Sequence, residues 1–163
     1  MPPARTRSSI RFSILDRLTG VAEVQSVQPV REMSAEGLRR SVLTDLKRLL
    51  NTRNDLQHWL ARYQEVRRSH LAFGIPDLST YSQSNVSDRQ QICGFIEEAI
   101  RTFEPRFVRR SVRVSLVPSE DVDDFRIHFR IEGTLYVEPI EQPVAFDTTM
   151  EMDTGAIEIG ESF

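Results

Sequence analysis

The apolar residues of this chain change their spacing once along the sequence, and this change limits the folds that the chain can adopt. Between residues 35 and 103, apolar residues recur three and four positions apart, as they do on one face of an α-helix. Between residues 112 and 150 they recur at every second position, as on one face of a β-strand. Helices followed by strands are typical of an α+β domain. We therefore expect N-terminal helices packed on one face of a C-terminal antiparallel β-meander of three to four strands.

Three segments carry the helical spacing. Residues 35–50 form the first, and residues 56–67 form a shorter second run. Residues 88–103 carry the clearest pattern, and Ser87 precedes Gln90 at the spacing of a capping box. The apolar stripe of this third segment comprises Ile92, Phe95, Ile96, Ala99, Ile100 and Phe103. We expect this helix to cover the apolar face of the sheet.

Four segments carry the strand spacing or suit a strand: 112–116, 125–137, 144–150 and the short segment 156–159. One face of the longest segment is predicted to carry Phe125, Ile127, Phe129, Ile131, Leu135 and Val137. The other face is predicted to carry Arg126, His128, Arg130 and Glu132. Gly133 interrupts the alternation, which predicts a bulge or a bend.

The composition fits one domain without a disulfide framework. With 163 residues, 39% of them hydrophobic, the chain can build one modest core. We assign that core to a single domain over residues 34–160, preceded by a partly flexible arm over residues 1–33. Cys93 is the only cysteine, so no internal disulfide can form. It borders the apolar stripe of residues 88–103, and we interpret it as a core residue.

Charge and hydropathy exclude two classes of partner. The formal net charge of −3 argues against a general nucleic-acid-binding protein, which would need a basic excess. No apolar run approaches the ~20 residues of a membrane span, and the first 30 residues lack the apolar region of a signal peptide. We therefore expect a cytoplasmic protein with no direct membrane insertion.

The sequence Glu104-Pro105-Arg106 breaks a local rule at the end of the clearest helix. Pro105 disfavours helical conformation at Glu104, so the helix should stop there. The carboxylate of Glu104 then lies beside the negative end of the helix dipole, which costs up to about 1 kcal/mol. Arg106, Arg109 or Arg110 can offset that cost by pairing with it. Two interpretations stay open: an exposed acid at a helix stop, or a stiff loop that presents Glu104 and Arg106 to a partner.

Three motifs together resemble TssE, the small baseplate subunit of type VI secretion systems, and the wider family of phage baseplate wedge proteins with a lysozyme-like name. Residues 49–53 resemble the end of the first TssE helix, and residues 73–79 resemble a Tyr-Gly-Leu-Pro-Asp-Leu-Ser stretch. Residues 104–106 match the Glu-Pro-Arg loop of the family. Besides these three motifs, residues 14–18 are similar to a short segment near the start of TssE chains. The resemblance assigns a structural role to Asn51, Thr52, Arg53, Phe73, Gly74, Pro76 and Asp77.

The resemblance implies a structural protein without catalytic residues, cofactor or metal. Its implied partners are TssF- and TssG-like baseplate subunits, TssK reached through the wedge, and the TssB/TssC sheath, in a baseplate docked at the inner membrane complex. Glu104 and Arg106 would bind partner chains, with Pro105 fixing their geometry. On this basis we expect Glu104→Ala and Arg106→Ala to leave the fold intact and to abolish secretion. The open edge of the meander would accept an extended arm of the sheath.

A glycoside hydrolase acting on peptidoglycan is the alternative function. It would need two carboxylates about 5 to 9.5 Å apart across a cleft. Glu104 could be one, but spacing singles out no second residue among Glu97, Glu98, Asp121, Asp123 and Asp124. The three histidines have no metal-ligand spacing; they are His58, His70 and His128.

Overall fold

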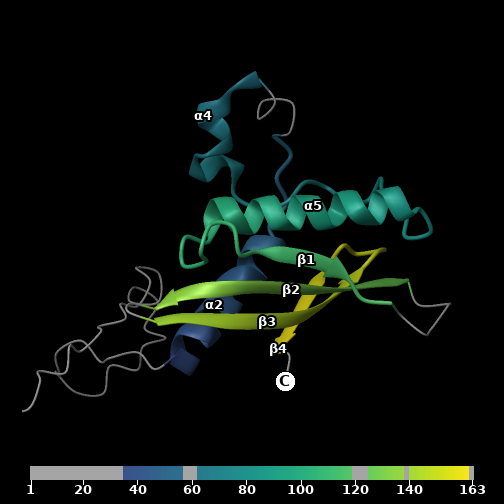
Figure 1. Cartoon of the computed structure of the whole chain (residues 1–163). Coiled ribbons are helices and arrows are strands. Elements are labelled where there is room, and N and C mark those ends of the chain that lie inside the picture. The colour runs from purple at the N-terminus through teal and green to yellow at the C-terminus, as the bar shows by residue number, and fades with distance from the viewer. Residues whose placement is uncertain (1–34, 57–61, 119–124, 138–139, 162–163) are drawn as a thin grey trace, which may run out of the picture.

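A computed structural model describes residues 35–56, 62–118, 125–137 and 140–161 of the chain. The predicted arm over residues 1–33, and with it the boundary at residue 34, lies outside the described residues. The helices are α2 (Ala35–Leu50), α4 (Gln64–Arg67), the 3₁₀ helix η1 (His70–Ala72) and α5 (Val86–Phe103). The strands are β1 (Arg113–Leu116), β2 (Arg126–Val137), β3 (Ile140–Glu151) and β4 (Ile157–Glu161). The predicted α+β order is confirmed (Figure 1).

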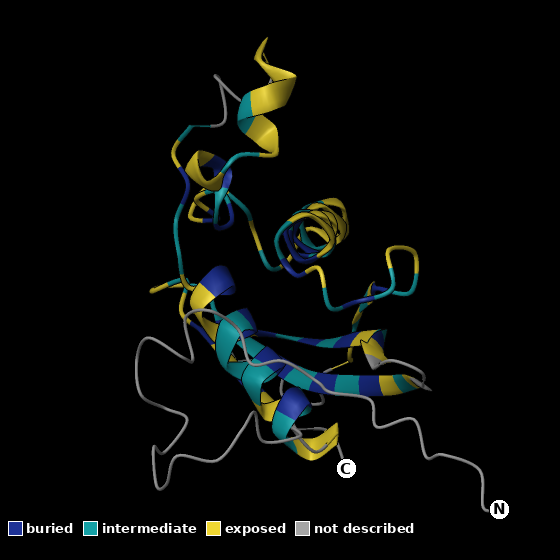
Figure 2. Cartoon of the chain, turned by 90° about the vertical axis from the view of Figure 1, so that its left-hand side faces the viewer, coloured by how far each residue is buried: buried dark blue, intermediate teal, exposed yellow. Residues whose placement is uncertain are grey.

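The strands form one antiparallel meander in the order β1-β2-β3-β4. Their pairing places Ile131 opposite both Val114 and Phe146, so the predicted alternation gives one apolar face. The buried residues of that face are Ile127, Phe129, Ile131, Leu135, Val144, Phe146, Met150, Ile157 and Ile159. Figure 2 shows buried and less buried residues alternating along the strands. One prediction is wrong: Phe125 precedes β2 and is 71% exposed.

Two helices cover the apolar face. α5 lies along β1, and α2 crosses behind the sheet at β3 and β4 (Figure 1). The prediction that N-terminal helices pack on one face of the sheet is confirmed, and α2 covers that face together with α5 because it presents its own apolar stripe to the sheet. The buried residues of α2 are Leu38, Val42, Leu46, Leu49 and Leu50, and those of α5 are Ile92, Cys93, Ile96, Ala99 and Ile100. Together with the sheet they form one core.

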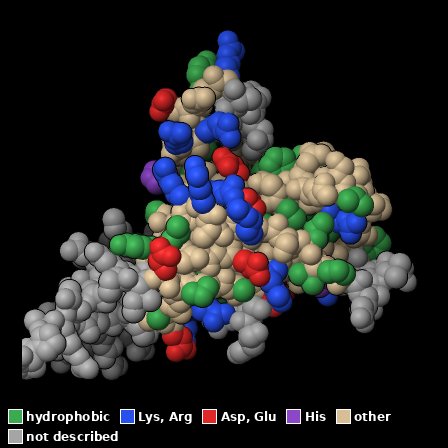
Figure 3. Space-filling view, in the orientation of Figure 1, with side chains coloured by type: hydrophobic (Ala, Val, Ile, Leu, Met, Phe, Trp, Pro, Cys, Tyr) green, Lys and Arg blue, Asp and Glu red, His purple; other side chains and the backbone are tan. Residues whose placement is uncertain are grey.

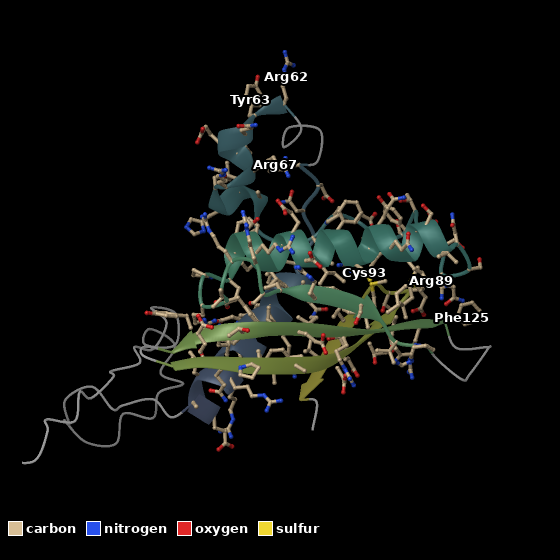
Figure 4. The ribbon with its side chains drawn as sticks, in the orientation of Figure 1. Arg62, Tyr63, Arg67, Arg89, Cys93 and Phe125 are labelled. Carbon is tan, nitrogen blue, oxygen red and sulfur yellow. The ribbon has the colours of Figure 1, made fainter. Side chains whose placement is uncertain are left out.

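The described part of the predicted helix over residues 56–67 is helical at Arg62 and at residues 64–67, but Tyr63 interrupts it. Tyr63 has extended backbone angles (φ −127°, ψ 106°), and α4 begins only after it. α4 has no buried residue, so no core contact outweighs the poor stability of a short helix. In Figure 4 the side chains of Arg62 and Tyr63 lie at the outer end of the projection that carries α4.

The N-cap of α5 also differs from the prediction. The helix begins at Val86, and its N-cap is Asn85, whose side-chain oxygen accepts a hydrogen bond of 3.0 Å from the backbone N–H of Ser87. The side-chain amide of Asn85 donates to Asp88 at 2.9 Å. Asn85 is as good an N-cap residue as Ser87, and it lets the helix start two residues earlier.

Gly133 does not form the predicted bulge. The β2–β3 pairing continues through it, with Gly133 opposite Val144. A Cβ at Gly133 would lie 2.7 Å from the ring of Phe107, which is itself buried. Glycine at this position therefore leaves room for Phe107 to pack on the strand.

Cys93 faces the sheet from α5 (Figure 4), as expected for a core residue. Burial raises the pKa of the Cys93 thiol, and the charge of Glu97 raises it further. A reactive thiol needs the opposite shift, because the thiolate is the nucleophile.

We predict that Cys93 of the folded protein reacts with a thiol reagent at pH 8 at least about tenfold more slowly than a free cysteine, because burial both raises its pKa and blocks access. Spectrophotometric titration with a disulfide reagent, before and after unfolding in guanidinium, measures this difference. Equal rates in the two states would contradict the core assignment.

Candidate functional site

The segment that follows α5 is a tight turn with Pro105 at its apex. The backbone N–H of Glu104 donates to Ile100 at 2.9 Å, which completes the helix. The N–H of Phe107 donates to the carbonyl of Glu104 at 3.3 Å and closes the turn. Pro105 is then the second residue of a four-residue turn, where its fixed φ is favoured, and it is exposed. Phe107 anchors the far side of the turn against Gly133.

The guanidinium of Arg106 joins this turn to α2. Its Nε donates to Oε1 of Glu104 at 2.7 Å, and its Nη2 donates to Oε2 of the same carboxylate at 2.5 Å. Nη2 also donates to Asp45 at 2.5 Å, and Nη1 donates to the hydroxyl of Ser41 at 2.9 Å. Four of the five guanidinium N–H groups are therefore used within the chain. We call Ser41, Asp45, Glu104 and Arg106 the arginine cluster.

The arginine cluster is largely removed from solvent. The Glu104 side chain is 5% exposed and that of Arg106 is 20% exposed. Burial on its own lowers the pKa of Arg106, but the hydrogen bonds and charges of Glu104 and Asp45 raise it by more, so the net shift is upward. The interpretation of Glu104 as an exposed acid is therefore wrong. Arg106, and not Arg109 or Arg110, offsets the cost of a carboxylate at the helix end.

Ser41 and Asp45 were not singled out from the sequence. They lie four residues apart on α2, each directly before a buried residue of the apolar stripe, Val42 and Leu46. A polar pair at that spacing lies on one side of a helix, beside the core. That spacing could have predicted that Ser41 and Asp45 act together, but it does not identify the distant side chain that they bind.

The two other motifs, residues 49–53 and residues 73–79, lie against each other. The N–H of Ile75 donates to the carbonyl of Thr52 at 2.9 Å, and the N–H of Asn54 donates to the carbonyl of Ile75 at 2.8 Å. Gly74 has φ +111°, and a Cβ there would lie 2.4 Å from the carbonyl oxygen of Thr52. Residues 73–79 therefore form an ordered loop held against the end of α2, and only glycine fits at residue 74.

Side chains fix both ends of that loop. The ring of Phe73 lies edge-on to Phe103 with centroids 5.5 Å apart. The carboxylate of Asp77, one residue after Pro76, accepts from the backbone N–H and the hydroxyl of Ser79, and these bonds lower the pKa of Asp77.

Asn51 and Arg53 connect the end of α2 to β4. The amide of Asn51 donates to the carbonyl of Ile157 at 2.8 Å and accepts from the N–H of Ile157 at 2.9 Å. The guanidinium of Arg53 donates to the carbonyl of Gly155. The motif assigned a structural role thus contacts a strand more than a hundred residues away, which the sequence did not predict.

Residues 49–53 and 73–79 are joined in space by the hydrogen bond between Ile75 and Thr52. A model of the family described as baseplate wedge protein gp25 matches residues 36–140, more than half of the chain. The chain belongs to this baseplate wedge family. It is accordingly a structural component of a baseplate.

A solved chain from "The baseplate complex from the type VI secretion system" is 20% identical, with a TM-score of 0.48, over 70% of this chain and 94% of that chain. No curated protein matches the sequence. The segment matched by the wedge family contains the arginine cluster and both motifs around Thr52 and Gly74.

Metal-ligating residues do not gather in the described part of this wedge-family chain. Among residues 35–56, 62–118, 125–137 and 140–161, no group of three or more His, Cys, Asp or Glu could hold a metal ion. His58 lies outside the described residues. Nδ1 of His128 forms a hydrogen bond of 3.1 Å with the hydroxyl of Thr149. Within the same residues, no helix is long and apolar enough to span a membrane.

Proposed function

We propose that this wedge-family protein is the small baseplate subunit of a type VI secretion system. In this role it binds TssF- and TssG-like subunits in the cytoplasm, reaches TssK through the wedge, and starts polymerisation of the TssB/TssC sheath. The baseplate that contains it docks at the inner membrane complex. Membership in the wedge family supports the baseplate role, and the three motifs that resemble TssE support the type VI assignment.

The proposed contact with the wedge partners is the Glu104–Arg106 turn. The arginine cluster holds this turn rigidly on α2, which leaves one N–H of Arg106 and the exposed ring of Pro105 for a partner. A rigid turn loses little conformational entropy on binding. The same burial disfavours the hydrolase alternative, because a general acid needs access to a sugar and Glu104 is covered. We propose that the protein has no catalytic role.

The sheath is proposed to bind at one edge of the sheet, and β1 is the unsuitable edge. The outward N–H of Val114 donates to the carboxylate of Glu97 on α5 at 3.2 Å. The outward carbonyl of Val112 accepts from Arg101 of the same helix at 3.2 Å. An added strand would have to displace both side chains.

The outer edge of β4 is the observation that carries the proposal. Asn51 satisfies the outward N–H and carbonyl of Ile157. In an antiparallel strand the direction alternates by residue, so the N–H and carbonyl of Ile159 also point outward, with no backbone partner in the described residues. An open groove of about 480 Å³ runs beside them, lined by Lys47, Asn51, Asp147, Thr149, Ile157, Glu158, Ile159 and Gly160. Unpaired groups beside a groove suit an added strand.

Glu161→Pro tests this edge. Glu161 lies two residues after Ile159 in β4, so its N–H also points away from β3. Proline would remove an outward donor without taking a hydrogen bond from the sheet. We expect a folded monomer with a melting temperature close to that of the parent, and no sheath assembly in cells that carry a fluorescent TssB.

Glu161→Ala is the matched control, because it removes the same side chain and keeps the N–H. It should assemble sheaths normally. Normal sheath assembly by a folded Glu161→Pro protein would exclude the β4 edge as the docking site.

A further inference from the structure

Arginine side chains gather around a hollow at the C-terminal end of α5. Figure 3 shows basic side chains clustered over this end of the helix and the base of the α4 projection. The hollow has a volume of about 480 Å³ and is lined by Arg68, Glu98, Arg101, Thr102, Arg109 and Arg110. We call it the basic groove. All four of its arginines are exposed.

Two charges of the basic groove already have partners. Arg101 forms an ion pair with Glu97, and Glu98 lies 3.5 Å from Arg67, which is outside the lining. Arg68, Arg109 and Arg110 have no acidic partner among the described residues. Within the described residues, the groove therefore holds three positive charges without an acidic partner, although the whole chain has a net charge of −3.

The backbone that carries Arg109 and Arg110 is held firmly. The N–H of Val108 donates to the carbonyl of Thr134 at 2.8 Å, and the N–H of Ser111 donates to Val108 at 2.9 Å. The hydroxyl of Ser111 accepts from the N–H of Thr134 at 2.9 Å. The two arginines are therefore the central residues of a turn fastened to β2.

Complementing the helix dipole does not explain this arrangement. Arg101 lies in the last turn of α5 and serves that purpose. Arg109 and Arg110 lie beyond the turn at Pro105, and crowding like charges around one hollow is unfavourable without a counter-charge. A negatively charged ligand would supply that counter-charge.

We propose that the basic groove binds an acidic segment of a partner protein. The guanidinium groups of Arg68, Arg109 and Arg110 would make charge-assisted hydrogen bonds to aspartate or glutamate carboxylates, which arginine can bind in bidentate fashion. A nucleic acid fits less well, because three charges in a confined hollow on an acidic chain would neutralise few phosphates. The proposal concerns the groove alone and holds whether or not the machine is a type VI secretion system.

The test measures binding of a short fluorescent glutamate-rich peptide to the purified full chain by anisotropy at low salt. We expect saturable binding that weakens with added salt, and no binding of the same peptide with glutamine in place of each glutamate. Arg109→Glu with Arg110→Glu should weaken binding by about tenfold or more. Arg109→Lys with Arg110→Lys should retain part of it, because the charge remains and the bidentate geometry is lost.

The matched control is Arg40→Glu with Arg126→Glu, which makes the same change of net charge at exposed positions of α2 and β2 outside the basic groove. Circular dichroism confirms that each variant is folded. The proposal is overturned by absence of saturable binding, by equal weakening in the control variant, or by tighter binding of a short single-stranded oligonucleotide or of inorganic phosphate.

Discussion

Replacing Arg106 with alanine should lower the free energy of unfolding by about 3 to 5 kcal/mol, the usual cost of removing one partner of a buried ion pair. Without the guanidinium, the carboxylate of Glu104, which is 5% exposed in the parent, loses its counter-charge, and Ser41 and Asp45 lose a donor. In a protein of this size the melting temperature should fall by about 10 °C. Urea denaturation followed by circular dichroism measures the change.

This outcome differs from the expectation drawn from sequence alone, which was an intact fold and lost secretion. Arg106→Lys is the conservative comparison. Lysine keeps the charge but cannot reach Glu104, Asp45 and Ser41 at once, so the free energy of unfolding of this variant should lie between that of Arg106→Ala and that of the parent. Ser41→Ala, which removes the hydroxyl that accepts from Nη1 of Arg106, should cost about 1 kcal/mol. If the free energy of unfolding of Arg106→Ala lies within about 1 kcal/mol of the parent value and the variant still abolishes secretion, then the arginine cluster serves mainly to bind partners and not to stabilise the fold.

Gly74→Ala should be the second strongly destabilising change, by about 2 to 4 kcal/mol. Gly74 has φ +111°, which side chains rarely adopt, and the new Cβ would lie 2.4 Å from the carbonyl oxygen of Thr52. That carbonyl accepts the N–H of Ile75, so relieving the clash breaks the pairing of the loop with the end of α2. Thermal unfolding and urea denaturation measure the loss.

Gly94 provides a matched control. It lies inside α5, and a Cβ there would meet nothing within 4 Å. Gly94→Ala should therefore raise stability by about 0.5 to 1 kcal/mol, because alanine favours a helix. If the two glycine variants had equal stability, residue 74 would not need the left-handed conformation that the structure gives it.

The sequence predicted the elements whose signal is local. Residues 35–50 are α2 with the bounds expected from its apolar spacing, and the alternation of Ile127, Phe129 and Ile131 is the buried face of β2. Periodicity is enough here because burial of one face is what stabilises each element.

The errors arose where several local solutions compete or where a distant contact decides. The apolar spacing over residues 56–67 fits one continuous helix, but Tyr63 interrupts it, and α4 after it has no buried residue. Asn85 and Ser87 are both good caps, and the sequence did not rank them. Glycine at residue 133 suggested a bulge. Its actual reason is the ring of Phe107, which packs against it from a distant segment that the local pattern does not reveal.

The candidate site shows the same limit. Glu104, Pro105 and Arg106 were identified from a broken helix rule and a family motif, and the structure adds that Arg106 reaches α2. No local pattern connects residue 106 to residues 41 and 45, because that contact depends on how α2 and α5 cross. Which partner the turn contacts is a property of the assembly, and it stays a prediction.

The measurement that tests the baseplate role most directly is affinity purification of the tagged full chain from its native cytosol, followed by mass spectrometry. We predict that TssF- and TssG-like subunits co-purify with the parent protein. They should not co-purify with a folded Pro105→Ala variant, which lacks the exposed proline ring. Recovery of the parent chain alone, or with cell-wall fragments and activity on peptidoglycan, would contradict the proposed structural role.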